Sequence, residues 1–331
     1  MKTMSRLCLL ASLTVSSAHA STLNIDIENT TVSGLSSGGY MATQFQLAHA
    51  EIVKGAGIVA AGPYYCAQNA ITTALAECIT TTTDEFSLAP LSGYIDQKQA
   101  SNVVSDDALI MQQRVMVIRG TKDQTINQKA SDMLVEQYKS LGIENITYID
   151  DKAFAHVFPT INDEGKCDVS EPPFIGACDY DAAGEILQHL HGDLSAPTSA
   201  NADNLITFSK HDKAKPEKAG MSDNAFAYVP SNCQDGEVCS VHISFHGCNQ
   251  SSEDVGDAYA TQTGFNRWAE SNNMIVLYPQ AKKSSLFPMN PQGCWDWWGY
   301  TDEKYATSEG QQIKTVRAML DDLPTVFSRL N

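Results

Sequence analysis

Apolar positions in the first two thirds of the chain follow two alternating patterns. Short uninterrupted apolar runs, such as "GAGIVAAG" (55–62) and "RVMVIRG" (114–120), are typical of strands buried on both faces. Between them, "YMATQFQLAHAEI" (40–52) and "NQKASDMLVEQYKSLG" (127–142) carry apolar residues at helical spacing. "NITYID" and "YDAAGEILQHLHG" continue the alternation. The pattern predicts an α/β fold, a mostly parallel sheet with helices on both faces.

The pattern changes after a brief linker-like stretch at 195–204. Three short strands joined by short loops are predicted from "NLITFSK", "AFAYVPS" and "SVHISFHG". A helix in 263–273, a strand in 274–280 and a long helix in 308–330 follow. Residues 63–110 show no clear pattern. We find no internal repeat, and expect residues 21–331 to form a single domain with no separate substrate-binding domain.

The first twenty residues have the features of a secretory signal peptide. Lys2 and Arg6 precede the short apolar run "LCLLASLTV", and "AHA" at 18–20 is a small-x-small cleavage site. No later stretch reaches the ~18 uninterrupted apolar residues of a membrane span. We therefore expect a secreted protein, extracellular or periplasmic, that does not bind membranes. As a separate expectation, we take the protein to be a monomer.

The charge of the chain argues against one class of partner. The formal net charge is −17, and removal of 1–20 with its two basic residues brings it to −19. So acidic a chain repels phosphate backbones, which argues against nucleic acid as a partner.

The cysteines predict disulfides. Eight of the nine cysteines lie outside 1–20, and an even number in an exported chain indicates disulfides. Proximity favours three local pairs and leaves two distant cysteines to join each other, although eight cysteines allow 105 pairings. A zinc site is disfavoured, because no C-x-x-C or H-E-x-x-H spacing occurs. The pairs expected are Cys66–Cys78, Cys167–Cys178, Cys233–Cys239 and Cys248–Cys294.

The segment "GLSSG" (34–38) fits the motif G-x-S-x-G only with Ser36 at its centre. This motif places a serine nucleophile on a strained turn between a strand and a helix, where a Cβ on the flanking residues would collide with backbone. A plain glycine–serine turn is the alternative reading. The predicted strand before Ser36 and the predicted helix after it favour the nucleophile.

A serine nucleophile needs a base and an acid, which follow it in the order acid, histidine in α/β-hydrolases. Asp123 lies in the loop after the strand "RVMVIRG", and His156 lies a few residues after the next strand. Both leave the same edge of a parallel sheet. We therefore predict Ser36, Asp123 and His156 as the catalytic triad. The rivals considered and disfavoured are His49, His189, His191, His211, His242, Asp150 and Asp151.

The segment "SVHISFHGCNQS" has the form of the hydrolase loop that supplies an oxyanion-hole donor, yet it follows Ser36 by some 210 residues. In the usual hydrolase order this loop precedes the nucleophile. The sequence therefore predicts a circularly permuted α/β-hydrolase. In it, 21–194 is the second half of the usual order and 205–331 the first half.

Five ordered motifs, "GLSSGGYM", "RGTKDQTI", "FAHVFP", "FHGCNQS" and "NPQGCWDWWGY", together resemble secreted poly(3-hydroxybutyrate) depolymerases of the single-domain, permuted type. The resemblance implies the same triad and places the oxyanion donors at the backbone N–H groups of Ser37 and Cys248. It implies hydrolysis of an insoluble or amorphous polyester without metal or cofactor.

Two other functions stay open. The motifs are also similar to feruloyl and acetyl-xylan esterases, which carry "HGC" and "CW-W" segments in unpermuted order. A non-catalytic polymer-binding protein on a hydrolase scaffold is the alternative from another class.

Aromatic residues near the predicted site are candidates for substrate contact. A disulfide from Cys294 would hold a tryptophan cluster beside the oxyanion loop, and indoles offer broad apolar contact to ester units. Core packing of some of these rings is the alternative. The candidates are Trp295, Trp297, Trp298 and Tyr40.

Overall fold

A computed structural model describes residues 23–80, 82–163, 165–209 and 213–330. The predicted signal peptide lies outside these residues. Eight strands form one sheet in the order β4-β3-β2-β1-β10-β11-β9-β8, and three short strands form a second sheet, β5-β7-β6. The strands are β1 (Asn24–Leu35), β2 (Val53–Val59), β3 (Arg114–Gly120), β4 (Asn145–Lys152), β5 (Phe158–Thr160), β6 (Gly165–Lys166), β7 (Ile175–Ala177), β8 (Leu205–Phe208), β9 (Ala225–Tyr228), β10 (Val238–Phe245) and β11 (Met274–Tyr278).

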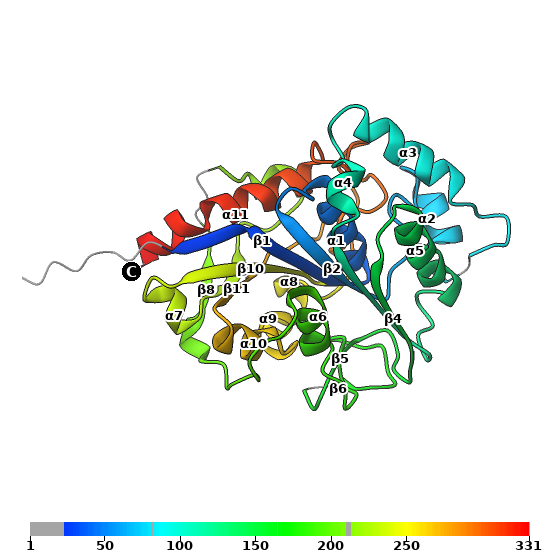
Figure 1. Ribbon diagram of the computed structural model, residues 1–331. Coiled ribbons are helices and arrows are strands. Elements are labelled where there is room, and N and C mark those ends of the chain that lie inside the picture. Colours follow the sequence, from blue (N-terminus) through cyan, green and yellow to red (C-terminus); the bar gives the residue numbers. More distant parts are fainter. Residues whose placement is uncertain (1–22, 81, 164, 210–212, 331) are drawn as a thin grey trace, which may run out of the picture.

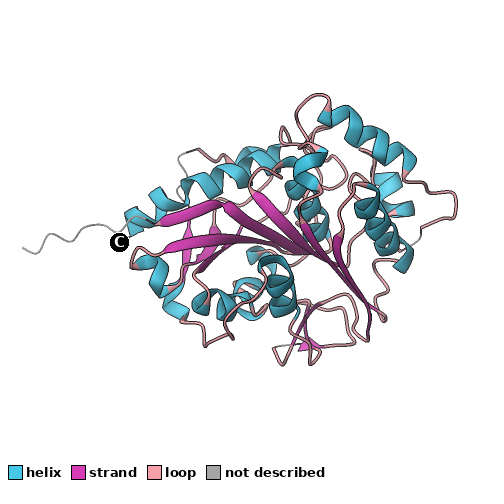
Figure 2. Cartoon of the chain, viewed as in Figure 1, coloured by secondary structure: helices cyan, strands magenta, loops and turns pink. Residues whose placement is uncertain are grey.

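Helices cover both faces of the large sheet, which runs as a continuous twisted layer between them (Figure 2). The α-helices are α1 (Ser37–Ala48), α2 (Ile71–Glu77), α3 (Ala89–Gln99), α4 (Asp107–Ile110), α5 (Gln128–Ser140), α6 (Ala182–His191), α7 (Ser231–Gln234), α8 (Ser252–Val255), α9 (Ala258–Gln262), α10 (Phe265–Ser271) and α11 (Gln311–Leu330). Two 3₁₀ helices are η1 (Ala202–Asn204) and η2 (Pro216–Ala219). The α/β prediction is confirmed.

The strand order agrees with the predicted permutation. β1, which leads into the Ser36 turn, lies in the middle of the sheet and pairs in parallel with β2 on one side and with β10 on the other. Strands β1 to β4 build outward in one direction, and β10, β11, β9 and β8 fill the other half. Only the β9 pairings, with β11 and β8, are antiparallel. Two distant parts of the chain therefore share one sheet, with β1 and β10 side by side at its centre.

Successive residues of the central strands enter opposite hydrophobic cores. On β2, Ile58 belongs to one core and Val59 to the other; on β3, Val117 and Ile118 divide in the same way. Since side chains alternate along a strand, burial on both faces requires an uninterrupted apolar run. This is why these strands could be recognised in the sequence.

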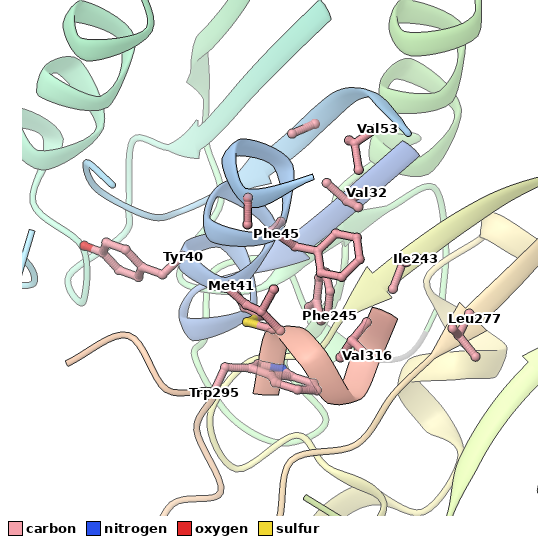
Figure 3. Close-up of a cluster of buried hydrophobic side chains, with 14 of the residues drawn as sticks. Val32, Tyr40, Met41, Phe45, Val53, Ile243, Phe245, Leu277, Trp295 and Val316 are labelled. Atoms are coloured by element: carbon pink, nitrogen blue, oxygen red, sulfur yellow. The ribbon is translucent and has the colours of Figure 1, made fainter. Parts of the chain in front are cut away.

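Helices α1, α5 and α11 contribute to the first core, and α6 and α10 to the second, on opposite sides of the sheet (Figure 1). In the first core, the Phe245 ring lies between Phe45 of α1 and Trp295, with centroid distances of 6.2 and 5.1 Å (Figure 3). This packing joins the helix that follows Ser36 to the end of β10 and to the tryptophan segment.

The four predicted disulfides are confirmed. Three close short segments, and the fourth, Cys248–Cys294, spans 46 residues and joins the loop after β10 to the tryptophan segment. No helix of the described residues combines the length and apolar character needed to cross a membrane.

Candidate active site

Ser36 occupies a strained turn between β1 and α1. Its backbone has φ 58° and ψ −121°, a left-handed conformation that L-residues rarely adopt. The Ser36 N–H donates to Val59 O at 2.9 Å, which ties the turn to the end of β2. A Cβ on Gly34 would lie 2.2 Å from Gly38 O, and one on Gly38 would lie 2.1 Å from Phe245 O. Both glycines of the motif are therefore required by close backbone approach.

Asp123 and His156 are in direct contact. His156 Nδ1 lies 2.8 Å from Asp123 Oδ2, and both side chains are buried. The other carboxylate oxygen, Oδ1, accepts from the N–H groups of Thr125 at 2.7 Å and Ile126 at 3.0 Å. The carboxylate is thus fixed by its own loop, and it holds the imidazole with Nε2 as the nitrogen left for chemistry.

Several interactions keep Asp123 ionised. Burial acts to raise the pKa of this carboxyl, but the hydrogen bond and charge of His156 and the two backbone N–H groups outweigh burial and lower the pKa below its usual 3.8. The His156 backbone is fixed in turn, since its N–H donates to Ser170 Oγ at 2.9 Å.

The side chain of Gln250 helps to fix the loop after β10 beside Ser36. Gln250 Oε1 accepts the Gly247 N–H at 2.7 Å, while its Nε2 donates to Pro173 O at 2.7 Å. Cys248 and Ser37 both line the same cavity as Ser36. Because Ser37 is the first residue of α1, its N–H has no partner in a preceding helical turn.

His246 is a structural part of this loop. It is fully buried, its Nδ1 donates to Gly247 O at 2.7 Å, and its Nε2 accepts the Ala281 N–H at 3.0 Å. Burial lowers the pKa of His246 to about 4. A neutral imidazole with both nitrogens engaged stabilises the loop and is not a candidate base.

Ser36 and His156 line one cavity of about 600 Å³ at the carboxyl ends of β1, β3 and β10. Apolar side chains of α2, among them Ile71 and Leu75, form part of its wall, and Met289 forms another part. The geometry brings the predicted serine, the Asp123–His156 pair and the oxyanion loop to one place. Such a set can carry out nucleophilic acyl transfer.

The rival histidines lie elsewhere. Of the described histidines only His156 lines this cavity. His242 is in β10, fully buried, with its nitrogens 2.8 Å from Thr31 Oγ1 and 2.7 Å from Ser33 Oγ. His191 contacts the same Thr31 hydroxyl at 2.9 Å. His211 is outside the described residues.

The four predicted aromatic contacts divide into two groups. Tyr40, Trp297 and Trp298 line the cavity, and the Tyr40 and Trp297 rings stack with centroids 4.5 Å apart. Trp295 is fully buried, points into the core and does not line the cavity (Figure 3). The prediction of substrate contact for Trp295 is therefore wrong, because this indole fills the space between Phe245 and His246.

Some residues of the site were missed in the sequence. Ser170, Gln250 and the α2 side chains come from segments without regular apolar spacing, and only the closeness of Gln250 to the "HGC" segment hinted at a role.

No group of three or more His, Cys, Asp or Glu side chains within the described part of the chain could hold a metal ion.

Known proteins that are similar to this chain include two polyester depolymerases. A family model described as the prolyl oligopeptidase family matches residues 12–169. A poly(3-hydroxybutyrate) depolymerase of Delftia acidovorans is 36% identical over 317 residues, which cover 93% of this chain and 63% of that protein. The chain thus spans less than two thirds of that relative. A polyhydroxybutyrate depolymerase of Talaromyces funiculosus is 32% identical over 92% of both chains.

Two solved structures are similar over nearly the whole chain. One is the PHB depolymerase from Penicillium funiculosum, and the other is a PHB depolymerase with a serine-to-alanine substitution, complexed with an R3HB trimer. Each is 30% identical, covers 90% of this chain and 96% of the other, and superposes with a TM-score of 0.83. Identity, coverage and topology agree, and the chain belongs to the polyhydroxybutyrate depolymerase family.

Proposed function

We propose that this protein is an extracellular serine esterase that hydrolyses poly(3-hydroxybutyrate)-type polyesters to short hydroxyacid oligomers or monomers. The observation that carries the proposal is that His156, paired with Asp123, lines the same largely apolar cavity as Ser36, which lies on a strained turn. All residues invoked come from one chain, so the site needs no second copy.

In the first half of the reaction, Ser36 is the nucleophile. His156 Nε2 takes the hydroxyl proton as Ser36 Oγ attacks the ester carbonyl, and ionised Asp123 stabilises the imidazolium that forms. The N–H groups of Ser37 and Cys248 donate to the oxyanion of the tetrahedral intermediate. The ester C–O bond then breaks, and His156 gives its proton to the departing alkoxide. A shortened chain with a new hydroxyl end leaves.

Water completes the reaction. His156 takes a proton from a water molecule, whose oxygen attacks the acyl carbon, and the bond to Ser36 Oγ breaks as the proton returns to that oxygen. The product is a hydroxyacid or a short oligomer. Each group ends in its starting state, so the residues need no further reagent.

The apolar side chains near the cavity support an apolar polymeric substrate. Leu286, Phe287 and Met289 are 80%, 96% and 64% exposed in one loop. Of these three, Met289 lines the cavity of Ser36, whereas Phe287 lines a separate cavity. Exposed apolar groups at this density are unusual outside binding surfaces.

Disulfides support the location outside the cell, because four of them persist only in an oxidising compartment.

We also infer that residues 21–331 act as one catalytic domain, since strands of both the first and the last third form its sheet.

Turnover of a polyester by the purified protein tests the proposal. We expect it to clear a poly(3-hydroxybutyrate) suspension and to release hydroxyacids identified by mass spectrometry. Ser36→Ala should lower kcat by roughly 10⁴-fold or more with an unchanged far-UV circular dichroism spectrum. An organophosphonate should label the wild type at Ser36.

Two results would contradict this. Release of ferulate or acetate from plant esters without clearing of the polyester would favour the feruloyl or acetyl-xylan esterase function. Binding of the polymer without hydrolysis, and without labelling of Ser36, would favour a non-catalytic polymer-binding protein.

A further inference from the structure

Asp296 is a buried carboxylate that the mechanism above does not use. It lies between Trp295 and Trp297 and is only 1% exposed. It forms no ion pair with any Lys, Arg or His of the described residues within the 4.0 Å limit for such pairs. A buried charge without a cation must be satisfied by hydrogen bonds, and those of Asp296 come from its own loop.

Five donors converge on the carboxylate. Oδ1 accepts from the N–H groups of Trp298 at 3.3 Å, Gly299 at 2.7 Å and Tyr300 at 2.9 Å. Oδ2 accepts from Thr301, from the N–H at 2.8 Å and from Oγ1 at 2.5 Å. The chain from 298 to 301 is therefore wrapped around one side chain.

The same residue is fixed to two helices through its main chain. Asp296 O accepts from Gln44 Nε2 of α1 at 2.9 Å, and the Asp296 N–H donates to Gln312 Oε1 of α11 at 2.7 Å. Just before it, the Trp295 N–H donates to Ser37 Oγ at 3.4 Å. The carboxylate thus fixes its loop relative to the helix that follows the nucleophile.

This loop carries the aromatic wall of the cavity. Trp297 stacks on Tyr40 at an interplanar angle of 11°, and Trp298 meets Trp297 edge-on at 82° with centroids 5.5 Å apart. Both tryptophans line the cavity, and Asp296 does not. A shift of the 298–301 turn would move the wall without moving Asp123 or His156.

We propose that Asp296 is a positioning residue that sets the tryptophan wall and thereby the affinity for substrates of more than one ester unit. The inference rests on the proposed function. An ester too short to reach the wall needs only Ser36, His156 and the oxyanion donors, whereas an oligomer also contacts Trp297 and Trp298. The effect of Asp296 is therefore on KM for oligomers and not on the bond-breaking step.

An asparagine cannot replace this carboxylate fully. Ionised aspartate has two acceptor oxygens, while asparagine has one acceptor and one donor group. In Asp296→Asn, either the three N–H groups at Oδ1 or the N–H of Thr301 would face an NH₂ group. Burial is the largest effect and leaves the pKa of Asp296 above its usual 3.8, while hydrogen bonds from Thr301, Tyr300 and Gly299 oppose that rise. The geometry itself needs two acceptor oxygens, because donors face both Oδ1 and Oδ2.

Steady-state kinetics on two substrates test this. We compare ethyl butyrate, followed by proton release, with the (R)-3-hydroxybutyrate trimer, followed by chromatography. Asp296→Asn should raise KM for the trimer roughly tenfold and leave kcat and KM for ethyl butyrate within about threefold. Thr301→Val, which removes only one donor, should raise the trimer KM roughly twofold to fivefold.

A matched control separates positioning from general loss of stability. Asp322 of α11 is also 1% exposed, accepts the backbone N–H groups of Lys213 and Ala214, and does not line the cavity. Asp322→Asn should lower the melting temperature without changing either KM. Equal changes for both substrates in Asp296→Asn, or a trimer KM raised as much by Asp322→Asn, would overturn the proposal.

Two further readouts complete the design. Acrylamide should quench tryptophan fluorescence more strongly in Asp296→Asn and in Thr301→Val than in wild type, because the tryptophan wall is less firmly held. This measurement needs no substrate. If Asp296→Asn does not fold, the Thr301→Val kinetics decide, and an unchanged trimer KM there overturns the proposal. Failure of the wild type to cleave the trimer would instead refute the proposed function, which the wild-type measurement reveals on its own.

Discussion

At the scale of single residues, Gly38 shows how closely the nucleophile and the oxyanion loop are packed. It lies in the first turn of α1, and a Cβ there would be 2.1 Å from Phe245 O and 2.4 Å from His246 O. Those carbonyls end β10 and begin the loop that carries Cys248. The absence of a side chain at 38 is what allows the two proposed oxyanion donors to share one cavity.

Gly38→Ala should therefore damage both stability and catalysis. The added methyl must push α1 away from the end of β10, which costs about 2–3 kcal/mol of unfolding free energy and moves one oxyanion donor. We expect kcat to fall roughly 10²-fold or more, measured on ethyl butyrate beside a urea unfolding curve. Gly93→Ala is the control, because Gly93 lies within α3 with no heavy atom within 4 Å of its ideal Cβ. Normal activity in Gly38→Ala would contradict the close approach.

The common location of Ser36, Asp123 and His156, our proposed triad, could be predicted from the sequence, whereas the residues that hold them could not. Asp123 and His156 each follow a strand with a legible apolar run, so the topology of a parallel sheet brings them together. Ser170 and Gln250 act from loops, where no periodicity indicates direction. Asp296 belongs to the motif "NPQGCWDWWGY", but the sequence alone did not show that its carboxylate accepts five hydrogen bonds from the residues that follow it.

At the scale of elements, the Cys248–Cys294 disulfide joins the loop after β10 to the tryptophan segment. Replacing both cysteines by alanine should cost about 4 kcal/mol by the loop-entropy relation for a 46-residue separation. Because the Cys248 amide is a proposed oxyanion donor, kcat should also fall. Melting temperature and kcat are the measurements.

Cys233–Cys239 provides the comparison for that prediction. It spans six residues and neither cysteine lines the cavity. Its double alanine variant should lose about 2 kcal/mol and keep wild-type kcat. Equal kcat in both double variants would show that the Cys248–Cys294 bond stabilises the fold without positioning the donor.

The elements that were missed either bury few side chains or are very short. Only Ala74 of α2 and only Leu91 and Ile95 of α3 are buried, so 63–110 carries no helical apolar stripe to recognise. The strands β5, β6 and β7 are two or three residues long, too short for any alternation to stand out. The central strands, buried on both faces, gave the clearest signal.

At the scale of the whole molecule, the two sheet halves meet at β1 and β10, and a chain of polar side chains crosses this junction. Thr31 and His242 are fully buried, and His191 is half-buried. Thr31 Oγ1 of β1 lies 2.8 Å from His242 Nδ1 of β10 and 2.9 Å from His191 Nε2 of α6. Burial, together with the nearby charge of Arg114, lowers the pKa of His191 to about 4, and burial lowers that of His242 well below 6.5. Neutral histidines therefore stabilise the joined sheet.

Acid should weaken this junction. The folded pKa of His191 lies below the unfolded value of 6.5, so the unfolded chain binds the proton more tightly. Its contribution is complete above about pH 6.5 and declines as the pH falls toward 4. Asp123 acts in the same direction at lower pH, because its lowered pKa gives stability that is lost below about 3.8.

Urea unfolding at pH 7 and 4.5 should show wild type losing stability, and His191→Gln should lose about 2–3 kcal/mol less than wild type over this interval. Identical losses in the two proteins would mean that His191 is solvated and carries no such linkage.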